Sequence, residues 1–345
     1  MNTIIEQRKQ NWIDFFDIKS PVSRILLTYC DENMPPCPLL WWENIKEREE
    51  WAYGKYMVQM DRLDKIHDNT IPFLSMLTGT EIFAEAFGCP VHKPIDNNPF
   101  ARPLIRDVSE WYKIKMPRWE DTNLTKLFDM ADHLKARAGK EALLSLPDIQ
   151  SPIDIAAIIW EKSDFYASMF DEEPAILELT AMIREFMFSF LDEWFRRYGS
   201  DFIAHHPDYY MPYGITLSED EIGIINSDMY RTYFHQELCD FSARYGAIGI
   251  HSCADSQHQW ENLKEIPNLK LLNLNRPDDL TLESFDFFRD CTALYPSVPV
   301  DSSSLKDHGK IHIASMFSFE TEKEAAAFAD QYNEETARIK ESMQQ

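Results

Sequence analysis

Short apolar runs alternate with longer amphipathic stretches over most of the 345-residue chain. Runs of a few mostly apolar residues, bounded by turn-forming residues, are typical of buried strands. The pattern predicts eight strands, at Arg24–Cys30, Thr70–Leu77, Ala142–Ile149, Asp201–His206, Ala247–Ser252, Lys270–Leu274, Ser297–Val300 and Ile311–Met316.

The stretches between these runs carry apolar residues at helical spacing. Glu173–Tyr198 is predicted to be a helix, with a proline in its first turn, where the missing N–H costs nothing. Ser218–Arg244 opens with Ser-Glu-Asp-Glu, a capping-box pattern that predicts a helix start at Ser218. Glu320–Ser342 is predicted to be a polar amphipathic helix, and residues 1–20 or so a helical N-terminal segment.

Strands that alternate with helices indicate parallel βα units, and eight such strands can close a (β/α)8 barrel. Only about ten residues separate the last two predicted strands, which is too short for a crossover helix, and an open doubly wound sheet produces a similar alternation. No internal repeat or clear linker divides residues 1–345. We therefore expect one α/β domain, a (β/α)8 TIM barrel with an N-terminal helical extension.

The charge balance narrows the range of partners. The chain has 34 Lys and Arg against 58 Asp and Glu, a formal net charge of −24, which repels phosphate backbones and argues against nucleic-acid binding. No apolar run approaches the ~20 residues of a membrane span, and the first residues do not resemble a signal peptide. The six cysteines contain no CxxC pair, so we expect a reduced, cytoplasmic protein that acts on a small molecule.

One candidate strand ends in a pair of metal-ligand residues. In "GAIGIHSCADS" (246–256), His251 and Cys253 are two residues apart, so on a strand their side chains point to the same side. An imidazole and a thiolate suit Zn²⁺, and a catalytic zinc needs a third protein ligand and an open position. The alternative is a hydrogen-bonded core histidine beside an inert buried thiol. The candidates for the third ligand are His205, His206, Asp255, Cys291, His312 and Met316.

The densest polar and aromatic cluster, "HHPDYY" (205–210), follows the fourth candidate strand. Because neighbouring strand residues point oppositely, we expect only one of His205 and His206 to face the site, as a general acid or base. We also name Tyr210, and Asp148 at the end of the third candidate strand, as catalytic candidates. The alternatives are a solvent-exposed loop for the cluster and a turn or cap residue for Asp148.

The order of several segments resembles the uroporphyrinogen decarboxylase superfamily, which includes that decarboxylase and zinc-dependent, corrinoid-linked methyltransferases. The resemblance implies a (β/α)8 barrel with its active site at the carboxyl ends of the strands. The segments that carry it are "GTEIFAEAFGCPV" (79–91), "NPFARPLIRDVSEWYKIKMP" (98–117), "LPDIQSPIDIAAIIW" (146–160), "YGITLSEDEIGIINSDMYRTYF" (213–234), "IHSCADSQHQW" (250–260) and "GKIHIASMFSFETEKEAAAF" (309–328).

The chain departs from both branches of this superfamily. The decarboxylase has an arginine-containing stretch after its first strand, where this chain reads "TYCDENMPPCPLLWW" (28–42), and its catalytic aspartate has no counterpart in "SMLTGTE" (75–81). The methyltransferases carry a His-x-Cys zinc pair where His251 and Cys253 stand here. Their third ligand, a cysteine after the last strand, is replaced in "ASMFS" (314–318) by Ser315 or Met316, of which we choose Met316.

These observations support three hypotheses. The first is zinc-dependent methyl transfer between a corrinoid carried by a partner protein and a thiol or similar acceptor, with zinc held by His251, Cys253 and Met316. The second is a metal-independent decarboxylase or lyase that uses a histidine as proton source on a carboxylated, tetrapyrrole-type or other substrate. The third is a non-catalytic barrel that binds a ligand or a corrinoid protein. The oligomeric state stays open, with a homodimer as one alternative.

Overall fold

The computed structural model describes residues 2–171, 173–274, 278–297, 299 and 310–343. Its longer helices are α1 (Thr3–Phe16), α2 (Ile45–Asp61), α4 (Thr125–Ala138), α5 (Pro152–Ile159), α6 (Lys162–Asp171), α7 (Glu173–Tyr198), α9 (His235–Tyr245), α11 (Asp278–Phe288) and α13 (Glu322–Ser342). Shorter helices are α3 (Ile82–Ala86), α8 (Ser227–Tyr233) and α10 (Trp260–Lys264), with 3₁₀ turns at Trp42–Asn44, Val108–Lys113, Trp119–Asp121, Glu221–Ile224 and Gln257–Gln259. None of the helices in these ranges is long and apolar enough to cross a membrane.

The parallel strands form the barrel wall. They are β1 (Val22–Cys30), β2 (Phe73–Leu74), β5 (Leu143–Leu144), β6 (Phe202–Ile203), β8 (Ile215–Ser218), β9 (Ile248–Ser252), β10 (Leu269–Leu274), β11 (Ala293–Leu294) and β12 (Ile311–Phe319). Six of them make one sheet in the order β1–β12–β11–β10–β9–β8. A parallel bridge from Gln150 to Ser218 joins this sheet to the segment that follows β5. A second parallel bridge, from Ser145 to Ile203, joins β5 to β6, and β5 also pairs with β2.

The segment just before β2 is linked to β1 mainly through side chains. The backbone N–H of Asn69 donates to the Leu26 carbonyl at 2.7 Å, and the side-chain Oδ1 of Asn69 accepts from the Leu26 backbone N–H at 3.0 Å. The Thr28 amide donates to the Asp68 carboxylate at 3.1 Å. Because these side chains, rather than a second strand, satisfy the edge of β1, the two strands can separate and leave room for a cavity.

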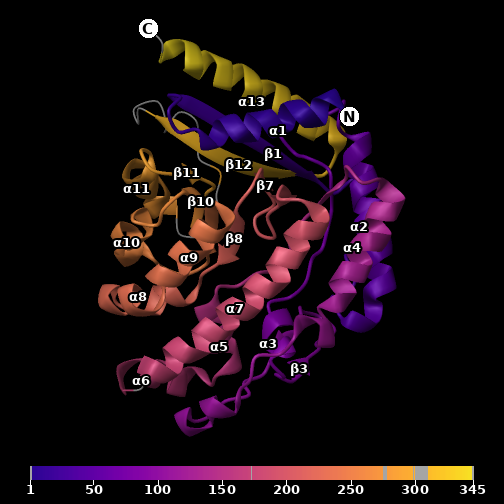
Figure 1. Ribbon diagram of the computed structural model, residues 1–345. Helices are drawn as coiled ribbons and strands as arrows, with labels where there is room; N and C mark the ends of the chain where they lie inside the picture. The colour runs from indigo at the N-terminus through magenta and orange to yellow at the C-terminus, as the bar shows by residue number, and fades with distance from the viewer. Residues whose placement is uncertain (1, 172, 275–277, 298, 300–309, 344–345) are drawn as a thin grey trace.

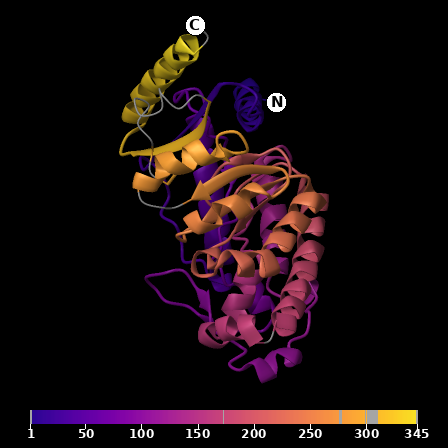
Figure 2. The ribbon, with the colours of Figure 1, turned by 90° about the vertical axis from the view of Figure 1, so that its left-hand side faces the viewer.

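The β1–β12 pair is packed between two helices. On its outer face, Leu26 and Tyr332 of α13 belong to one buried apolar cluster. On its inner face, the ring nitrogens of His312 lie 2.8 Å from the carbonyl oxygens of Phe15 and Ser20, at the end of α1. Figure 1 shows α1 and α13 beside these two strands, and Figure 2 shows α13 next to β12 from a second direction. Both ring nitrogens of His312 therefore face backbone carbonyls near the start of β12, away from the carboxyl ends of the strands, so His312 is not placed to join a metal site at that rim.

Two short pairs of antiparallel strands lie outside the parallel wall. One is β3 (Val91–His92) with β4 (Phe100–Ala101), in the excursion that follows α3. The other is β7 (Tyr210–Met211), which folds back against β6. The chain therefore passes the end of β6 and returns alongside it before it enters β8. This return places the "HHPDYY" segment inside a tight loop.

The predicted helix over Ser218–Arg244 is wrong at its start. Ser218 is the last residue of strand β8, where its amide donates to the Ile149 carbonyl and its carbonyl accepts from the Ser151 amide, both at 2.9 Å. The helices of this region begin only at Ser227 and His235. The Ser-Glu-Asp-Glu pattern imitates a capping box, but the backbone of Ser218 is committed to the sheet.

The seventh strand also differs from its predicted position. Residues 298 and 300 of the predicted strand Ser297–Val300 lie outside the described residues. Strand β11 is found at Ala293–Leu294, paired in parallel with β10 and β12. A two-residue strand is too short to stand out as an apolar run, which explains the shift. The predicted helix Glu173–Tyr198 is confirmed at both ends.

Candidate metal centre and neighbouring cavity

The parallel register of three neighbouring strands brings polar side chains into one row. His251 at the end of β9 is paired with Ser218 of β8 on one side and with Asn273 of β10 on the other. Because the strands are parallel, their carboxyl ends meet at the same rim of the barrel, where the active sites of this architecture lie.

Three potential metal ligands converge at this rim. The Nε2 atom of His251 lies 3.0 Å from the Sγ atom of Cys253, and the Cys253 amide donates to the Asp220 carboxylate at 2.6 Å. One ligand atom from each residue lies within 4.8 Å of the other two. His251 is buried, Asp220 is partly buried and Cys253 is exposed, so the cluster opens toward solvent on the thiol side.

The neighbours of His251 determine its tautomer and keep its imidazole neutral. Its Nδ1 atom is hydrogen-bonded to the Oδ1 atom of Asn273, whose side-chain amide donates in turn to the Tyr295 carbonyl. Asn273 thus accepts from Nδ1–H, which leaves the Nε2 lone pair directed at Cys253. Burial and the neighbouring His206 lower the pKa of His251, although the bond to Asn273 opposes this shift. A neutral imidazole with a fixed tautomer is the form that binds a metal.

Buried carboxyl groups position the loop that carries Asp220. The Asp154 carboxylate accepts from the amide of Asp220 at 2.7 Å and from that of Glu221 at 3.1 Å. Burial beside other acids raises the pKa of Asp154 to about 7, and burial also raises that of Glu219. These hydrogen bonds from the backbone N–H groups fix residues 220–221 after β8, so the Asp220 side chain has a defined position next to β9.

Both histidines of the "HHPDYY" segment lie close to the rim. His205 Nε2 is 2.9 Å from the hydroxyl of Ser218 and 3.7 Å from the carboxylate of Asp148, and the His206 ring is 4.5 Å from the His251 ring. The expectation that only one of the two would face the site is wrong, because β6 ends at Ile203 and strand alternation does not extend to residues 205 and 206.

The pKa shifts of His205 and Asp148 indicate which of the two can donate a proton. Burial, reinforced by the neighbouring histidines, lowers the pKa of His205 to about 3, so its imidazole is neutral at physiological pH. Burial raises the pKa of Asp148 to about 6, while a hydrogen bond from Gln150 opposes the increase. Of this pair, Asp148 is therefore the better proton donor near pH 6, and His205 serves as a hydrogen-bonding group.

Two of the predicted site residues lie apart from the donor cluster. The hydroxyl of Tyr210 donates at 3.4 Å to the carboxylate of Asp201, the residue just before β6. The Lys9 Nζ atom lies 5.5 Å from the centre of the Tyr210 ring. Met316 lies on β12 opposite Leu27 and is 44% exposed. Both side chains line a cavity to which none of the three donors contributes.

The sequence prediction missed Asp220. The available signal was the apolar run Ile215–Leu217 directly before it, which reads as a strand that ends at the same rim. The capping-box pattern at Ser218 obscured this signal, because it assigned residues 218–221 to a helix.

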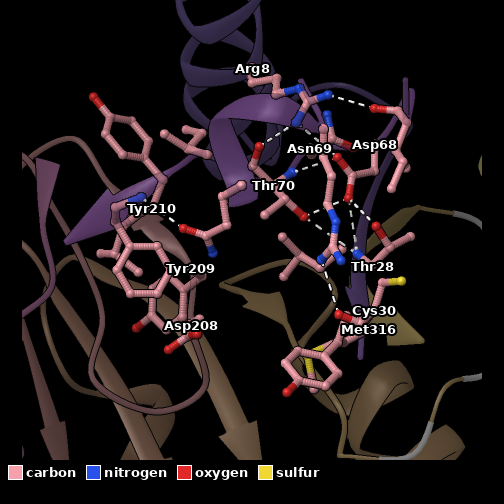
Figure 3. A pocket seen from close by; sticks show the side chains of 18 of the residues that line it. Arg8, Thr28, Cys30, Asp68, Asn69, Thr70, Asp208, Tyr209, Tyr210 and Met316 are labelled. Carbon is pink, nitrogen blue, oxygen red and sulfur yellow. Dashed lines mark hydrogen bonds and ion pairs between the residues drawn. The ribbon is translucent and has the colours of Figure 1, made fainter. Parts of the chain in front are cut away.

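The cavity lies where β1 and β2 separate, and together with the open solvent at its mouth it encloses about 760 Å³. Figure 3 shows Asp208, Tyr209 and Tyr210 on one side of it, and Thr28, Cys30 and Met316 on the other. Tyr209 connects the cavity to the donor cluster. A Cβ atom at Gly249, two residues before His251 on β9, would lie 2.0 Å from the Tyr209 hydroxyl.

The comparisons with known proteins agree with this architecture. The uroporphyrinogen decarboxylase (URO-D) family model matches residues 57–291, more than half of the chain. The chain belongs to the uroporphyrinogen decarboxylase family. Members of this family are (β/α)8 barrels, and the predicted fold class is thereby confirmed.

A solved structure of a methyltransferase from Methanosarcina mazei has the same fold. It aligns with a TM-score of 0.66 and 10% sequence identity over 94% of this chain and 99% of that chain. A search of the curated proteins finds no significant match. At such low identity the structural likeness establishes the fold, and the chemistry has to be argued from the residues of the site.

Proposed function

We propose that this member of the uroporphyrinogen decarboxylase family is a zinc-dependent methyltransferase. It would move a methyl group between a corrinoid held by a partner protein and a thiol or similar acceptor. The observation that carries the proposal is the convergence of Asp220, His251 and Cys253 within 4.8 Å at the carboxyl rim of the barrel. The Methanosarcina structure shows that a methyltransferase exists with this fold, and the reaction class is argued from the donor residues themselves.

The residues present fit a zinc ion. Imidazole nitrogen, thiolate sulfur and carboxylate oxygen are the three ligand types that zinc takes in proteins, and three protein ligands leave a position for substrate. His251 is neutral, and among the described residues its Nε2 atom contacts the Cys253 sulfur. The backbone N–H of Asp220 donates to the Asp154 carboxylate, which restricts the loop that carries Asp220. We propose Asp220 as the third ligand in preference to Met316.

Bound zinc would lower the pKa of a substrate thiol, so that the nucleophilic thiolate exists at neutral pH. The residues of the chain have supporting roles in this scheme. Asn273 keeps the His251 tautomer, and Asp154 keeps Asp220 in place. The exposed His206 packs its ring against that of His251, 4.5 Å between centroids, and so supports one face of this imidazole.

Metal content tests the proposal directly. The purified chain is stripped with a chelator, incubated with zinc and analysed by elemental analysis. We expect about one zinc per chain, and at least a tenfold weaker zinc affinity in Cys253→Ser and His251→Ala, because each removes one ligand. The control is Cys37→Ser, an exposed thiol in the loop after β1, which should bind zinc as the parent does. A parent protein that takes up no zinc contradicts the proposal.

The buried group Asp148, His205 and Ser218 supports a second candidate, a metal-independent lyase such as a decarboxylase. Here Asp148, with its pKa of about 6, would supply the proton, because His205 is neutral and a poor acid. This candidate predicts activity that survives chelation and is lost in Asp148→Asn. A barrel that only binds a ligand would instead be stabilised by that ligand without any turnover.

A further inference from the structure

Most charged groups around the cavity between β1 and β2 already have internal partners. Asp68 accepts hydrogen bonds from the hydroxyls of Thr28 at 2.5 Å and Thr70 at 2.6 Å, and pairs with the Arg8 guanidinium at 2.9 Å. Arg62 pairs with the Glu322 carboxylate at 3.3 Å and donates to backbone carbonyls. These groups hold the cavity wall together and need no ligand.

Lys55 differs from them. Its ammonium is largely buried, with the side chain 12% exposed, and it lies 4.5 Å above the ring centre of Phe73. It forms an ion pair with Asp208 at 3.6 Å, and that carboxylate is 47% exposed, so the pair is long and well screened by water. A buried cation with so weak a partner favours the approach of a second anion.

The charges at the cavity balance within ion pairs. Asp68 pairs with Arg8, Glu322 pairs with Arg62 just outside the lining, and Asp208 pairs with Lys55. The lining therefore lacks the negative excess of the chain as a whole, whose formal net charge is −24. Of the three cations, Lys55 has the longest ion pair, so it is the one that an incoming anion can approach.

The other walls are flat and apolar. Tyr29 is 41% exposed and Met316 is 44% exposed, and both side chains line the cavity. Trp12, Phe73 and Tyr209 complete an aromatic lining. Large apolar side chains that remain exposed in a concave site are typical of a binding site for a small organic molecule.

We propose that this cavity binds a planar aromatic carboxylate. The acid group pairs with Lys55, and the ring lies among Tyr29, Tyr209 and Met316. Tyr209 is also the residue in close contact with β9, the strand that carries His251. The cavity lies apart from the cluster of Asp220, His251 and Cys253, so this inference goes beyond the proposed function, and the binding is measured without turnover.

The test uses benzoate as the probe and the full chain as the protein. Benzoate is titrated while tryptophan fluorescence and the thermal midpoint are followed, with benzyl alcohol and benzylamine as comparison probes. We expect saturable binding that is strongest for benzoate, because only benzoate carries a negative charge. Lys55→Gln should weaken benzoate binding about tenfold, since it removes one charge-assisted contact. Tyr29→Ala should weaken it severalfold through lost stacking.

Lys46→Gln is the matched control, because Lys46 is exposed on the same helix and lies outside the cavity lining. It should bind benzoate as the parent does. Absence of saturable benzoate binding, stronger binding of benzylamine, or equal effects of the Lys55 and Lys46 substitutions would each overturn the inference. Benzoate binding without zinc uptake would retain this site and refute the proposed function. Zinc uptake without benzoate binding would do the opposite.

Discussion

Two of the three candidate donors at the rim depend on a residue outside the donor cluster. Asn273 determines which nitrogen of His251 carries the proton, and Asp154 holds the backbone next to Asp220. These supporting contacts come from β10 and α5, elements distant in the sequence from the His-x-Cys pair. The geometry and protonation of the candidate site thus depend on two further elements of the fold.

The third ligand can be identified by comparing two substitutions. Asp220→Asn should weaken zinc affinity at least tenfold, because an amide oxygen is a much poorer ligand than a carboxylate. Met316→Leu should leave the zinc affinity unchanged, since Met316 lies in the cavity lining apart from the donor cluster. Competition with a chromophoric chelator measures both affinities. The reverse result would restore Met316 as the ligand.

Strand and helix ends determine where the rim residues lie. The short length of β6 lets both His205 and His206 turn toward the site, and the return of the chain through β7 places Tyr209 against β9. On the opposite side of the barrel, α13 starts with a capping box, in which Thr321 and Glu324 satisfy each other's backbone amides. That helix covers the outer face of β1 and β12.

Close packing between the 204–210 loop and β9 can be tested with a double-mutant cycle. Gly249→Ala should destabilise the fold by about 2 kcal/mol, because the added methyl group would meet the buried Tyr209 hydroxyl at 2.0 Å. Tyr209→Phe removes that oxygen and leaves the next ring atom 3.3 Å away. The combined variant should therefore recover part of the lost stability in urea unfolding. Strict additivity of the two effects would contradict this contact.

The helix cap offers a second test at this scale. Thr321→Ala should lower the free energy of unfolding by about 1 kcal/mol, because the backbone N–H of Glu324 loses its acceptor and the Glu324 carboxylate loses the hydroxyl that donates to it. Thr321→Ser keeps the hydroxyl and should change the stability by only a few tenths of that amount. Chemical denaturation measures both variants, and an equal loss in serine and alanine would show that the methyl group matters rather than the cap.

At the scale of the whole molecule, an acid-rich chain buries several of its carboxyl groups. Burial raises the pKa of Glu81 to about 8, that of Asp154 to about 7 and that of Asp148 to about 6. The unfolded chain loses these protons at the ordinary carboxyl pKa, whereas the folded chain retains them to higher pH. Stability is therefore complete below the ordinary value and decreases as pH rises toward the folded value.

Glu81 should account for a large share of this decrease. Between pH 5 and pH 8 the parent should lose on the order of 2–4 kcal/mol through this group, at about 1.4 kcal/mol per unit of pKa difference. Glu81→Gln cannot ionise, so its stability should fall less over the same range. Glu47→Gln, exposed on α2, is the control and should follow the parent curve. Parallel curves for Glu81→Gln and the parent would contradict the assignment.

Much of the architecture could be predicted from periodicity and residue type. The apolar runs predicted β1, β9, β10 and β12 nearly at their observed bounds, and helix α7 at both ends. These elements are long enough to bury a continuous apolar face, so their local pattern carries the signal. Alternation predicted that His251 and Cys253 lie on one side, and their 3.0 Å contact agrees with this, although β9 itself ends at Ser252.

The sequence by itself thus determined the long elements, the family resemblance and the pairing of His251 with Cys253 in the candidate site. Only the tertiary structure decided that β8 is a strand, that Asp220 joins the pair and that Met316 and Tyr210 line a separate cavity. The physical reason is that short strands such as β8 and β11 are stabilised by ladder bonds to neighbours far away in the chain. The position of Asp220 depends in the same way on Asp154, 66 residues earlier.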